Sequence, residues 1–566
     1  MFSSKKNVLQ TVALLKAYGI HNIVVSPGSR NAPLTYCFNE DDYFSCYSIV
    51  DERSAAYFAI GLICKLKKPV VICCTSGTAL LNYSPAVAEA FYQELPLIVI
   101  SADRSQALIG QMDGQTLPQP GVFGSMVKKA VQLPEITSDE DLWYCNRLVN
   151  EALMECTHKN GGPVHINVPV SEPLFDFTEK ALPQVRKIQL YSANKLLDIG
   201  SFYSKWKYFG KRMILLGQMP RNKDLIDLLE TLSRKTDCVI LCEHLANASS
   251  PAFIGNFDAV LAALPQGVAA DYAPDLLITI GGHVVSKRIK KFLRDNPPQN
   301  HWHIVASGIC VDTFKSLTDL VETDGVSFFK ELANAVVTDD ILTNNIKSYS
   351  LLWEKASSSI LPPDYSLPFS DISVVGSFMR RIPENAALYV GNSSAVRNIQ
   401  FYPVAPSVEV LCNRGTNGIE GTVSSASGFA LFHPELTFLI VGDLSFFYDL
   451  NALTNKYISS GLRIILINNG GGGIFHFLPG LEKSDVLEKY VAAGHSMCAE
   501  GWVKAAGFKY LFARNAEELE KRLPEFVQAK SEQTLFLEVF TSPEMNKSAS
   551  EIYYQTIKKA INYVNK

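Results

Sequence analysis

The chain has 566 residues, a hydrophobic fraction of 47% and a formal net charge of −4 at pH 7. This length exceeds what one hydrophobic core can serve, so roughly three or four domains are expected. The slightly acidic balance argues against nucleic acid as a partner, and the strand-sized apolar runs argue against a membrane span. No apolar segment of the signal-peptide kind follows the N-terminal residues. The twelve cysteines contain no Cys-x-x-Cys pair, which favours buried, reduced thiols in a cytoplasmic protein.

The first predicted segment, residues 1–182, alternates helices and strands. We expect a helix over residues 8–18, strands over 23–25, 70–75 and 97–101, and a last strand near His165. Polar turns follow these strands: Ser-Pro-Gly-Ser-Arg at 26–30, Thr-Ser-Gly-Thr at 75–78 and Ala-Asp-Arg at 102–104. Asp-Glu-Arg at 51–53 begins a small apolar helix. Arginines and backbone amides at strand ends are suited to binding anions, although exposed loops often contain a single arginine too.

Two further segments continue the alternation. Strands are predicted over 213–216, 239–242, 276–280 and 303–305 in the second, residues 190–345. The stretch around Pro183 is interpreted as a linker, and a polar stretch over 339–359 suggests the second domain boundary. The third segment, residues 365–566, begins with a strand over 387–390, followed by Gly-Asn-Ser-Ser-Ala-Val-Arg. Alternation throughout predicts an α/β protein of three doubly wound parallel sheets covered on both faces.

Two strand ends in the third segment predict a metal site. One apolar run ends in Gly-Asp-Leu-Ser at residues 442–445, and a second ends at Asn469, with a helix expected between them over 450–459. This unit places Asp443 and Asn469 at the carboxyl ends of parallel strands. A carboxylate, an amide oxygen and a backbone carbonyl suit Mg²⁺ beside a diphosphate, and the glycines at 470–473 permit a tight turn. The alternative is an ordinary sheet with an Asp in one turn and an Asn pair in another.

This spacing resembles the fingerprint of the thiamine-diphosphate (ThDP)-dependent enzyme family, in which Gly-Asp-x precedes Asn-Asn by about two dozen residues. The full motif set, with Asn-Arg-Gly-x₂-Gly-Ile at 413–419, resembles the branch that joins 2-oxoglutarate to isochorismate in menaquinone biosynthesis. The resemblance covers almost the whole chain and is weakest in the middle. It departs at Gly470, where some relatives have a third Asn, and at Gly114, where an Asn can precede the glutamine.

The resemblance implies pyrimidine-binding, central and diphosphate-binding domains, with ThDP and Mg²⁺ as cofactors and Mn²⁺ as an alternative metal. It implies that Glu52 contacts N1′ of the aminopyrimidine, although a Glu at a helix start is more often a partner of the helix dipole. The implied metal ligands are Asp443, the side chain of Asn469 and the carbonyl of Gly471. The implied cofactor-binding residues are Glu52, Asn392, Ser393, Ile419, Gly442, Asp443, Leu444, Ser445 and Asn469.

The same resemblance implies the substrate contacts. Both substrates are dicarboxylates, so cationic side chains are required where they are desolvated. The succinyl end is expected at Arg397, Arg414 and Ser393, and isochorismate at Ser29, Arg30, Arg104, Gln115 and Lys287. An apolar wall is expected from Ile474, Phe475 and Leu478, which as bare residues would more often be plain core. The family also implies active sites shared between subunits, hence a homodimer or a dimer of dimers.

Other functions compete with this interpretation. Another ThDP-dependent 2-oxo acid carboligase or decarboxylase is the nearest alternative, and acetohydroxyacid synthase, which usually binds FAD, is one example. A non-catalytic binding subunit that kept the fold is an alternative of another class. A nucleotide-binding dehydrogenase is disfavoured because no Gly-x-Gly-x-x-Gly follows a first strand.

Overall fold

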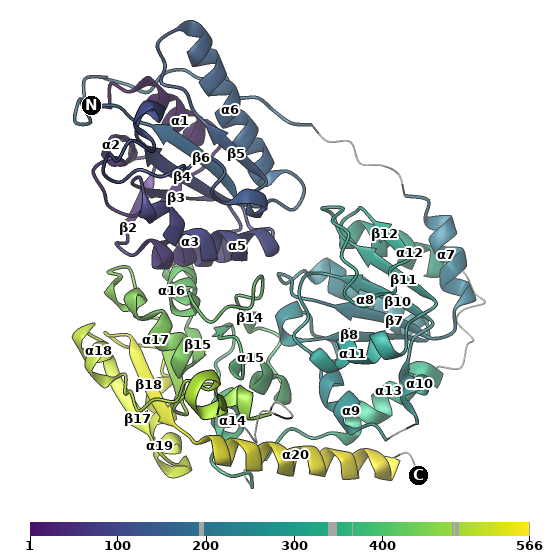
Figure 1. Cartoon of the computed structure of the whole chain (residues 1–566). Coiled ribbons are helices and arrows are strands. Elements are labelled where there is room, and N and C mark those ends of the chain that lie inside the picture. Colours follow the sequence, from purple (N-terminus) through teal and green to yellow (C-terminus); the bar gives the residue numbers. More distant parts are fainter. Residues whose placement is uncertain are drawn as a thin grey trace.

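The fold is taken from a computed structural model that describes residues 1–191, 197–265, 267–337, 348–364, 366–477, 480 and 486–564. Within these residues the named strands form three parallel sheets of six strands each. Figure 1 shows three bodies, with the first sheet above the third and the second sheet beside them. We call them the first, central and third domains. The predicted α/β class with three helix-covered parallel sheets is confirmed, while the exact domain boundaries stay predictions.

The first domain has the strand order β2-β1-β3-β4-β6-β5. Along β3, Val71 and Cys73 belong to one buried cluster, and Val70, Ile72 and Cys74 belong to another on the opposite face. Apolar residues on both faces explain why these strands are continuous hydrophobic runs. The strands are β1 (Asn22–Val25), β2 (Ser45–Ser48), β3 (Val70–Cys74), β4 (Leu97–Asp103), β5 (Lys129–Gln132) and β6 (Val164–Pro169); the α-helices are α1 (Lys6–Ala17), α2 (Ala32–Glu40), α3 (Glu52–Leu66), α4 (Thr78–Asn82), α5 (Ser84–Tyr92) and α6 (Asp139–Thr157).

The central domain has the order β12-β11-β10-β7-β8-β9. Its strands are β7 (Arg212–Leu216), β8 (Cys238–Cys242), β9 (Phe253–Ile254), β10 (Leu276–Ile280), β11 (Asn300–Ile304) and β12 (Asp319–Val321). Its helices are α7 (Ile199–Tyr208), α8 (Lys223–Lys235), α9 (Phe257–Ala263), α10 (Ala269–Tyr272), α11 (Lys287–Asp295), α12 (Gly325–Val337) and α13 (Ser348–Ser359). The strand predicted over 303–305 begins three residues earlier, because Thr279 bonds the ring of His301 at 2.9 Å and makes that polar residue compatible with burial.

The third domain has the order β14-β13-β15-β16-β18-β17. Its strands are β13 (Ala387–Val390), β14 (Glu409–Leu411), β15 (Thr437–Gly442), β16 (Leu462–Asn468), β17 (Lys509–Ala513) and β18 (Leu535–Phe540). Its helices are α14 (Asp371–Met379), α15 (Ala395–Asn398), α16 (Thr422–Phe432), α17 (Asp443–Tyr448), α18 (Glu500–Ala505), α19 (Ala516–Phe526) and α20 (Pro543–Val564). Helix α20 leaves this domain and runs beneath the central one, against α9 and α13 (Figure 1).

One predicted helix is wrong. The helix expected over 450–459 is replaced by α17, which begins at Asp443, and by a 3₁₀ helix over Leu450–Thr454. Asp449 separates the two, because its buried carboxylate accepts hydrogen bonds from Ser424 at the start of α16. The polar stretch over 339–359, which suggests a domain boundary, contains α13 from Ser348 onward, where Trp353 is buried and donates to the carbonyl of Tyr272. The rest of that stretch, 339–347, lies outside the described residues.

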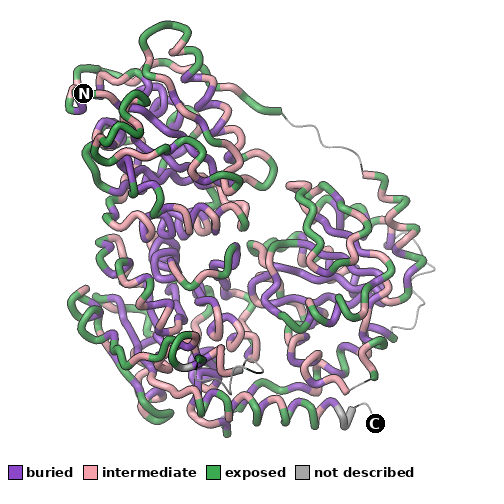
Figure 2. Tube along the Cα trace, in the orientation of Figure 1, coloured by how far each residue is buried: buried purple, intermediate pink, exposed green. Residues whose placement is uncertain are grey.

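Helices α3 and α16 pack closely against each other and join the first and third domains. A Cβ at Gly61 would lie 2.0 Å from the Ser425 carbonyl oxygen, and one at Gly428 would lie 2.1 Å from that of Phe58. Only glycine permits two helices to approach this closely. Figure 2 shows both helices in the colour of buried residues where the domains meet. Among the described residues, no helix is both long and apolar enough to cross a membrane.

Candidate functional site

The predicted metal loop lies at the carboxyl ends of β15 and β16, which are adjacent strands. The Asp443 carboxylate is 2% exposed, and its Oδ2 accepts the backbone amides of Asn469, Gly470 and Gly471 at 3.1, 2.9 and 3.0 Å. Burial raises the pKa of this carboxyl, although these amides and the nearby His495 oppose the shift. The structure therefore brings Asp443, Asn469 and the glycine loop together, as the sequence predicts.

Asn469 has the orientation that a metal ligand needs. Its Nδ2 donates to Asp371 Oδ2 at 3.1 Å, while its Oδ1 is buried without a hydrogen-bond partner among the described residues. A buried acceptor left unpaired is costly unless a ligand satisfies it. No described group of three or more His, Cys, Asp or Glu could hold a metal ion. A metal here would therefore depend on amide and carbonyl oxygens beside one carboxylate, a donor set that suits Mg²⁺.

Two arginines converge beside this loop. Asn392 follows β13, and its Nδ2 donates to the carbonyls of Asn413 and Gly418, both at 2.6 Å. Its Oδ1 accepts Nη1 of Arg414 at 2.9 Å, while Nε of Arg414 has no partner among the described residues. Burial, followed by the positive charge of Arg414, lowers the pKa of Arg397. Two partly desolvated guanidinium groups in one place are suited to binding a carboxylate.

Ser393 supports one of these arginines. Its carbonyl accepts a hydrogen bond from Nη1 of Arg397, and its φ of +71° lies in the left-handed region. A non-glycine residue in this region is strained, and such strain is most often found at functional sites. Ser393 thus lies at the arginine pair, as the sequence predicts.

A cavity of about 400 Å³ lies between the central and third domains. It is lined by three of the predicted residues, Lys287 at the start of α11, Arg397 on α15 and Ile474 beside the glycine loop. Figure 1 shows α11 and α15 on facing sides of the boundary between the two domains. The cavity therefore combines three cationic residues, Lys287, Arg288 and Arg397, with the edge of the predicted metal loop.

Glu243 is a cavity residue that the sequence analysis missed. It follows β8, is 5% exposed, and accepts the amides of Val285 and Ser286, both at 2.6 Å. Burial raises its pKa to about 7. Its carboxylate fixes the turn that leads into α11 and Lys287. A β-strand followed by Cys-Glu-His gives no signal of this role, because the amides it binds are about 40 residues away in the sequence.

The predicted residues of the first domain lie away from this cavity. Arg30 is buried and donates to the Val170 carbonyl at 2.9 Å while pairing with Glu172 at 3.0 Å. Arg104 donates through Nε to the carbonyl of Gly114 at 2.8 Å. Ser29 and Gln115 are exposed, and none of these four predicted residues belongs to the described lining of the cavity. Within one chain the structure does not bring them to the metal loop.

Glu52 begins α3, with Asp51 as the capping residue whose side chain accepts the amide of Ser54. Burial raises the pKa of Glu52. Its neighbours contact the third domain: Asp51 accepts Nδ2 of Asn451 at 2.5 Å, and Arg53 lies 4.5 Å from the ring centroid of Tyr448. A carboxyl with a raised pKa is suited to exchanging a proton near neutral pH.

The remaining predicted residues surround the loop or lie outside the described chain. Ser445 donates to the carbonyl of Ile419, which is 37% exposed. Leu444 follows Asp443 on α17, and Gly442 ends β15. Ile474 and Phe475 are half-buried in a 3₁₀ helix, whereas Leu478 lies outside the described residues.

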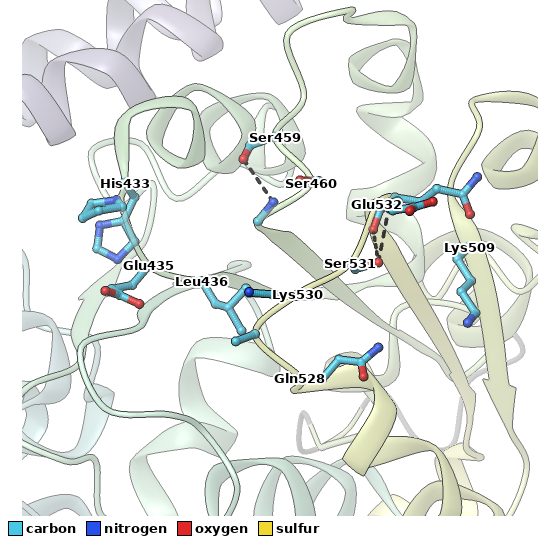
Figure 3. A pocket seen from close by; sticks show the side chains of 14 residues that line it. His433, Glu435, Leu436, Ser459, Ser460, Lys509, Gln528, Lys530, Ser531 and Glu532 are labelled. Atoms are coloured by element: carbon cyan, nitrogen blue, oxygen red, sulfur yellow. Dashed lines mark hydrogen bonds between the residues drawn. The ribbon is translucent and has the colours of Figure 1, made fainter.

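A larger hollow, about 860 Å³, lies at the opposite edge of the third sheet. Figure 3 shows its side chains, which include His433, Lys509 and Lys530, spread around an open groove. It contains none of the predicted site residues. The cavity between the central and third domains is therefore the better candidate.

Comparisons with known proteins agree with this geometry. The family model described as "Thiamine pyrophosphate enzyme, N-terminal TPP binding domain" matches residues 9–124. A Bacteroides thetaiotaomicron protein named 2-succinyl-5-enolpyruvyl-6-hydroxy-3-cyclohexene-1-carboxylate synthase is 48% identical over 566 residues, covering 99% of this chain and 100% of that protein. Proteins of the same name from Phocaeicola vulgatus, 47% identical over 99% of both chains, and Porphyromonas gingivalis, 36% identical over 100% of this chain and 99% of that one, are also similar. The similarity extends across all three domains.

Proposed function

Because the chain belongs to the 2-succinyl-5-enolpyruvyl-6-hydroxy-3-cyclohexene-1-carboxylate synthase family, we propose that it catalyses that family's reaction. It is a ThDP-dependent transferase of menaquinone biosynthesis. It decarboxylates 2-oxoglutarate and adds the succinyl unit to isochorismate in 1,4 fashion. The full-length similarity carries this proposal and favours it over acetohydroxyacid synthase, the nearest alternative.

The third domain provides the residues that would hold the cofactor. Asp443, Oδ1 of Asn469 and the carbonyl of Gly471 would bind Mg²⁺ or Mn²⁺, and the unpaired Oδ1 of Asn469 supports this set. Gly442, Leu444, Ser445, Asn392, Ser393 and Ile419 would surround the diphosphate and the rings. When bound, ThDP supplies the electron sink for the loss of CO₂ from 2-oxoglutarate.

The acid–base step belongs to Glu52. Its carboxyl would hold and return the proton at N1′ of the pyrimidine, which requires a pKa above that of an ordinary glutamate. Burial raises the pKa of Glu52 in that direction. The residue is not needed to cap its helix, because Asp51 already caps α3.

Cationic residues would hold the three carboxylates that remain after CO₂ leaves. Arg397, Arg414 and Ser393 would hold the succinyl end, since the charge of Arg414 helps to lower the pKa of Arg397 and the Ser393 carbonyl accepts a hydrogen bond from Arg397. Isochorismate would contact Lys287 across the cavity and residues of the first domain, namely Ser29, Arg30, Arg104 and Gln115. Ile474, Phe475 and Leu478 would form an apolar wall that excludes water.

The separation of the first-domain residues from the cavity supports a shared active site. We propose a homodimer, or a dimer of dimers, in which the first domain of one subunit completes the site of another. A cytoplasmic location fits this metabolic role, and the described cysteines are all unpaired. Mixing Glu52→Ala and Asp443→Ala chains should then restore part of the activity. No recovery at all would contradict shared sites.

The decisive assay measures CO₂ release from 2-oxoglutarate with and without isochorismate, in the presence of ThDP and Mg²⁺. We expect release from 2-oxoglutarate and formation of the adduct when isochorismate is present. Release from pyruvate instead would contradict the substrate assignment. Calorimetry with ThDP and Mg²⁺ separates a further case, because a non-catalytic relative would bind neither.

A further inference from the structure

A buried carboxylate of the first domain accepts hydrogen bonds from a loop of the third domain. Glu89 lies on α5 and is 1% exposed. Its Oε1 accepts the amide of Gly415 at 2.7 Å, and its Oε2 accepts the amide and hydroxyl of Thr416 at 2.7 and 2.8 Å. Nε2 of Gln93 donates to the same carboxylate at 2.5 Å. Four donors converge on one carboxylate, which leaves the loop little freedom to move away.

The contact is part of a junction of all three domains. Besides donating to Glu89, Gln93 accepts a hydrogen bond through Oε1 from Nε2 of Gln218, which lies after β7 in the central domain. The same Nε2 of Gln218 donates to the carbonyl of Cys412 in the third domain at 3.0 Å. A chain of polar side chains thus connects α5 to the segment that begins the loop.

The loop is shaped for this contact. A Cβ at Gly415 would lie 2.6 Å from the Glu89 carbonyl oxygen and 3.0 Å from its carboxyl carbon, so only glycine permits the approach. Arg414 directly precedes Gly415, and its guanidinium is fixed at the other end by Asn392. Glu89 therefore determines where the backbone of Arg414 lies, although it does not touch the guanidinium.

We propose that Glu89 is a positioning residue that sets Arg414 for the distal carboxylate of the 2-oxo acid. This inference rests on the proposed function, in which Arg414 binds the succinyl end. A carboxylate is required because both of its oxygens receive N–H donors. A glutamine would direct its NH₂ group at one of those donors and lose that bond.

The variant Glu89→Gln tests the inference with little change in shape. We expect the KM for 2-oxoglutarate to rise about ten-fold, since bonds to charged groups are the strong ones. The KM for isochorismate and the affinity for ThDP should stay within two-fold. Discrimination between 2-oxoglutarate and 2-oxopentanoate, which lacks the distal carboxylate, should fall by the same factor. Hydrogen exchange over residues 412–419 should become faster.

Asp237→Asn is a matched control. Asp237 is also a buried carboxylate that accepts two backbone amides, those of Tyr349 and Ser350 at 2.9 and 2.7 Å. This variant should accelerate exchange near Tyr349 and leave the KM for 2-oxoglutarate unchanged. Thr416→Val, which removes only the hydroxyl bond to Glu89, should raise that KM about three-fold, and it decides the matter if Glu89→Gln does not fold.

An unchanged KM for 2-oxoglutarate, or equal increases for 2-oxoglutarate and 2-oxopentanoate, would overturn the inference. An equal effect of Asp237→Asn would do the same, because it would mark a general loss of stability. If the unaltered enzyme releases no CO₂ from 2-oxoglutarate, the proposed function fails and the inference with it. If the unaltered enzyme releases CO₂ from 2-oxoglutarate and Glu89→Gln has the same KM, the inference is overturned while the proposed function stands.

Discussion

The two edges of the third sheet differ in chemistry more than in size. The carboxyl edge gathers buried polar groups, among them Asp443 and Asn392, and it contributes Arg397 and Ile474 to the lining of a cavity of about 400 Å³. The amino edge has the larger hollow, about 860 Å³, but exposed side chains such as Lys530 and Glu532 line it (Figure 3). Both edges belong to the same strands, so the contrast comes from the loops attached at the two ends of each strand.

The difference shows that volume alone does not identify a site. At the carboxyl edge, acceptors such as Oδ1 of Asn469 lack a partner and are held in place by neighbours. At the amino edge, Lys530 and Glu532 are exposed to solvent, and His433 and Lys509 have partners, Asn385 and Glu525 respectively. Desolvated, oriented polar groups can discriminate between ligands. A ligand that supplies the missing partner of a buried group lowers the free energy of the complex, whereas a ligand that lacks this partner does not.

Replacing Asp443 should have the largest effect. Asp443→Asn keeps the shape but removes the negative charge of the proposed metal ligand. We expect the affinity for ThDP with Mg²⁺, measured by calorimetry, to fall about 100-fold or more, since even outer partners of metal ligands are worth about 10- to 100-fold. Circular dichroism should show a folded protein. An unchanged affinity for ThDP and Mg²⁺ would contradict the assignment of the metal site to the carboxyl edge.

Removing one guanidinium should have the next largest effect. Arg397→Ala takes away a cation that the cavity exposes, and a charge-assisted bond contributes about 1.5–3 kcal/mol. We expect kcat/KM for 2-oxoglutarate to fall by about 10- to 100-fold, with ThDP affinity retained. Arg381→Ala is a useful control, because Arg381 pairs with Glu520 on α19 and does not line the cavity. An equal loss in both variants would contradict the assignment.

The pH dependence of stability should next distinguish the cavity, which Glu243 of the central domain also lines, from the amino edge. Burial raises the pKa of Glu243 to about 7 from the ordinary 4.5, so between these values the folded protein keeps a proton that the unfolded chain has lost. The stability linked to this group is fully present below about pH 4.5 and is lost as the pH rises through 7, up to about 3 kcal/mol. Glu243→Gln should therefore make the free energy of unfolding fall less steeply as the pH rises through this range.

Urea unfolding between pH 5 and 8 measures this slope. Burial also raises the pKa of Asp449 to about 7, so part of the decline should persist in the Glu243 variant. Glu532→Gln, at the amino edge, should leave the slope unchanged. A Glu243→Gln variant with the original slope would show that this carboxyl titrates at its ordinary pKa.

The smallest effect is expected at the amino edge itself. Lys530→Ala removes an exposed side chain of the larger hollow. Surface substitutions of this kind usually change the unfolding free energy by less than about 0.5 kcal/mol. We expect kcat/KM and the thermal midpoint to match the unaltered enzyme. A clear loss of activity would mean that the amino edge has a function after all.

The alternation of helices and strands could be predicted from the sequence, because strands buried on both faces are continuous apolar runs. The same reasoning missed β2, β5, β9, β12 and β17, which are the edge strands of their sheets, and it also missed β18, which is a buried inner strand. It placed Asp443 and Asn469 at neighbouring strand ends correctly, since consecutive parallel strands joined by a short crossover are usually adjacent, as β15 and β16 are.

The residues that support the site became visible only in the folded chain. Glu89, Glu243 and Asp371 each bind groups that are far away in the sequence, and no local pattern distinguishes them from surface carboxylates. The start of α17 at Asp443 and the helix α13 were likewise set by contacts with other elements. Local periodicity reports how much of a segment is buried, whereas the partner of a buried polar group depends on how distant segments pack.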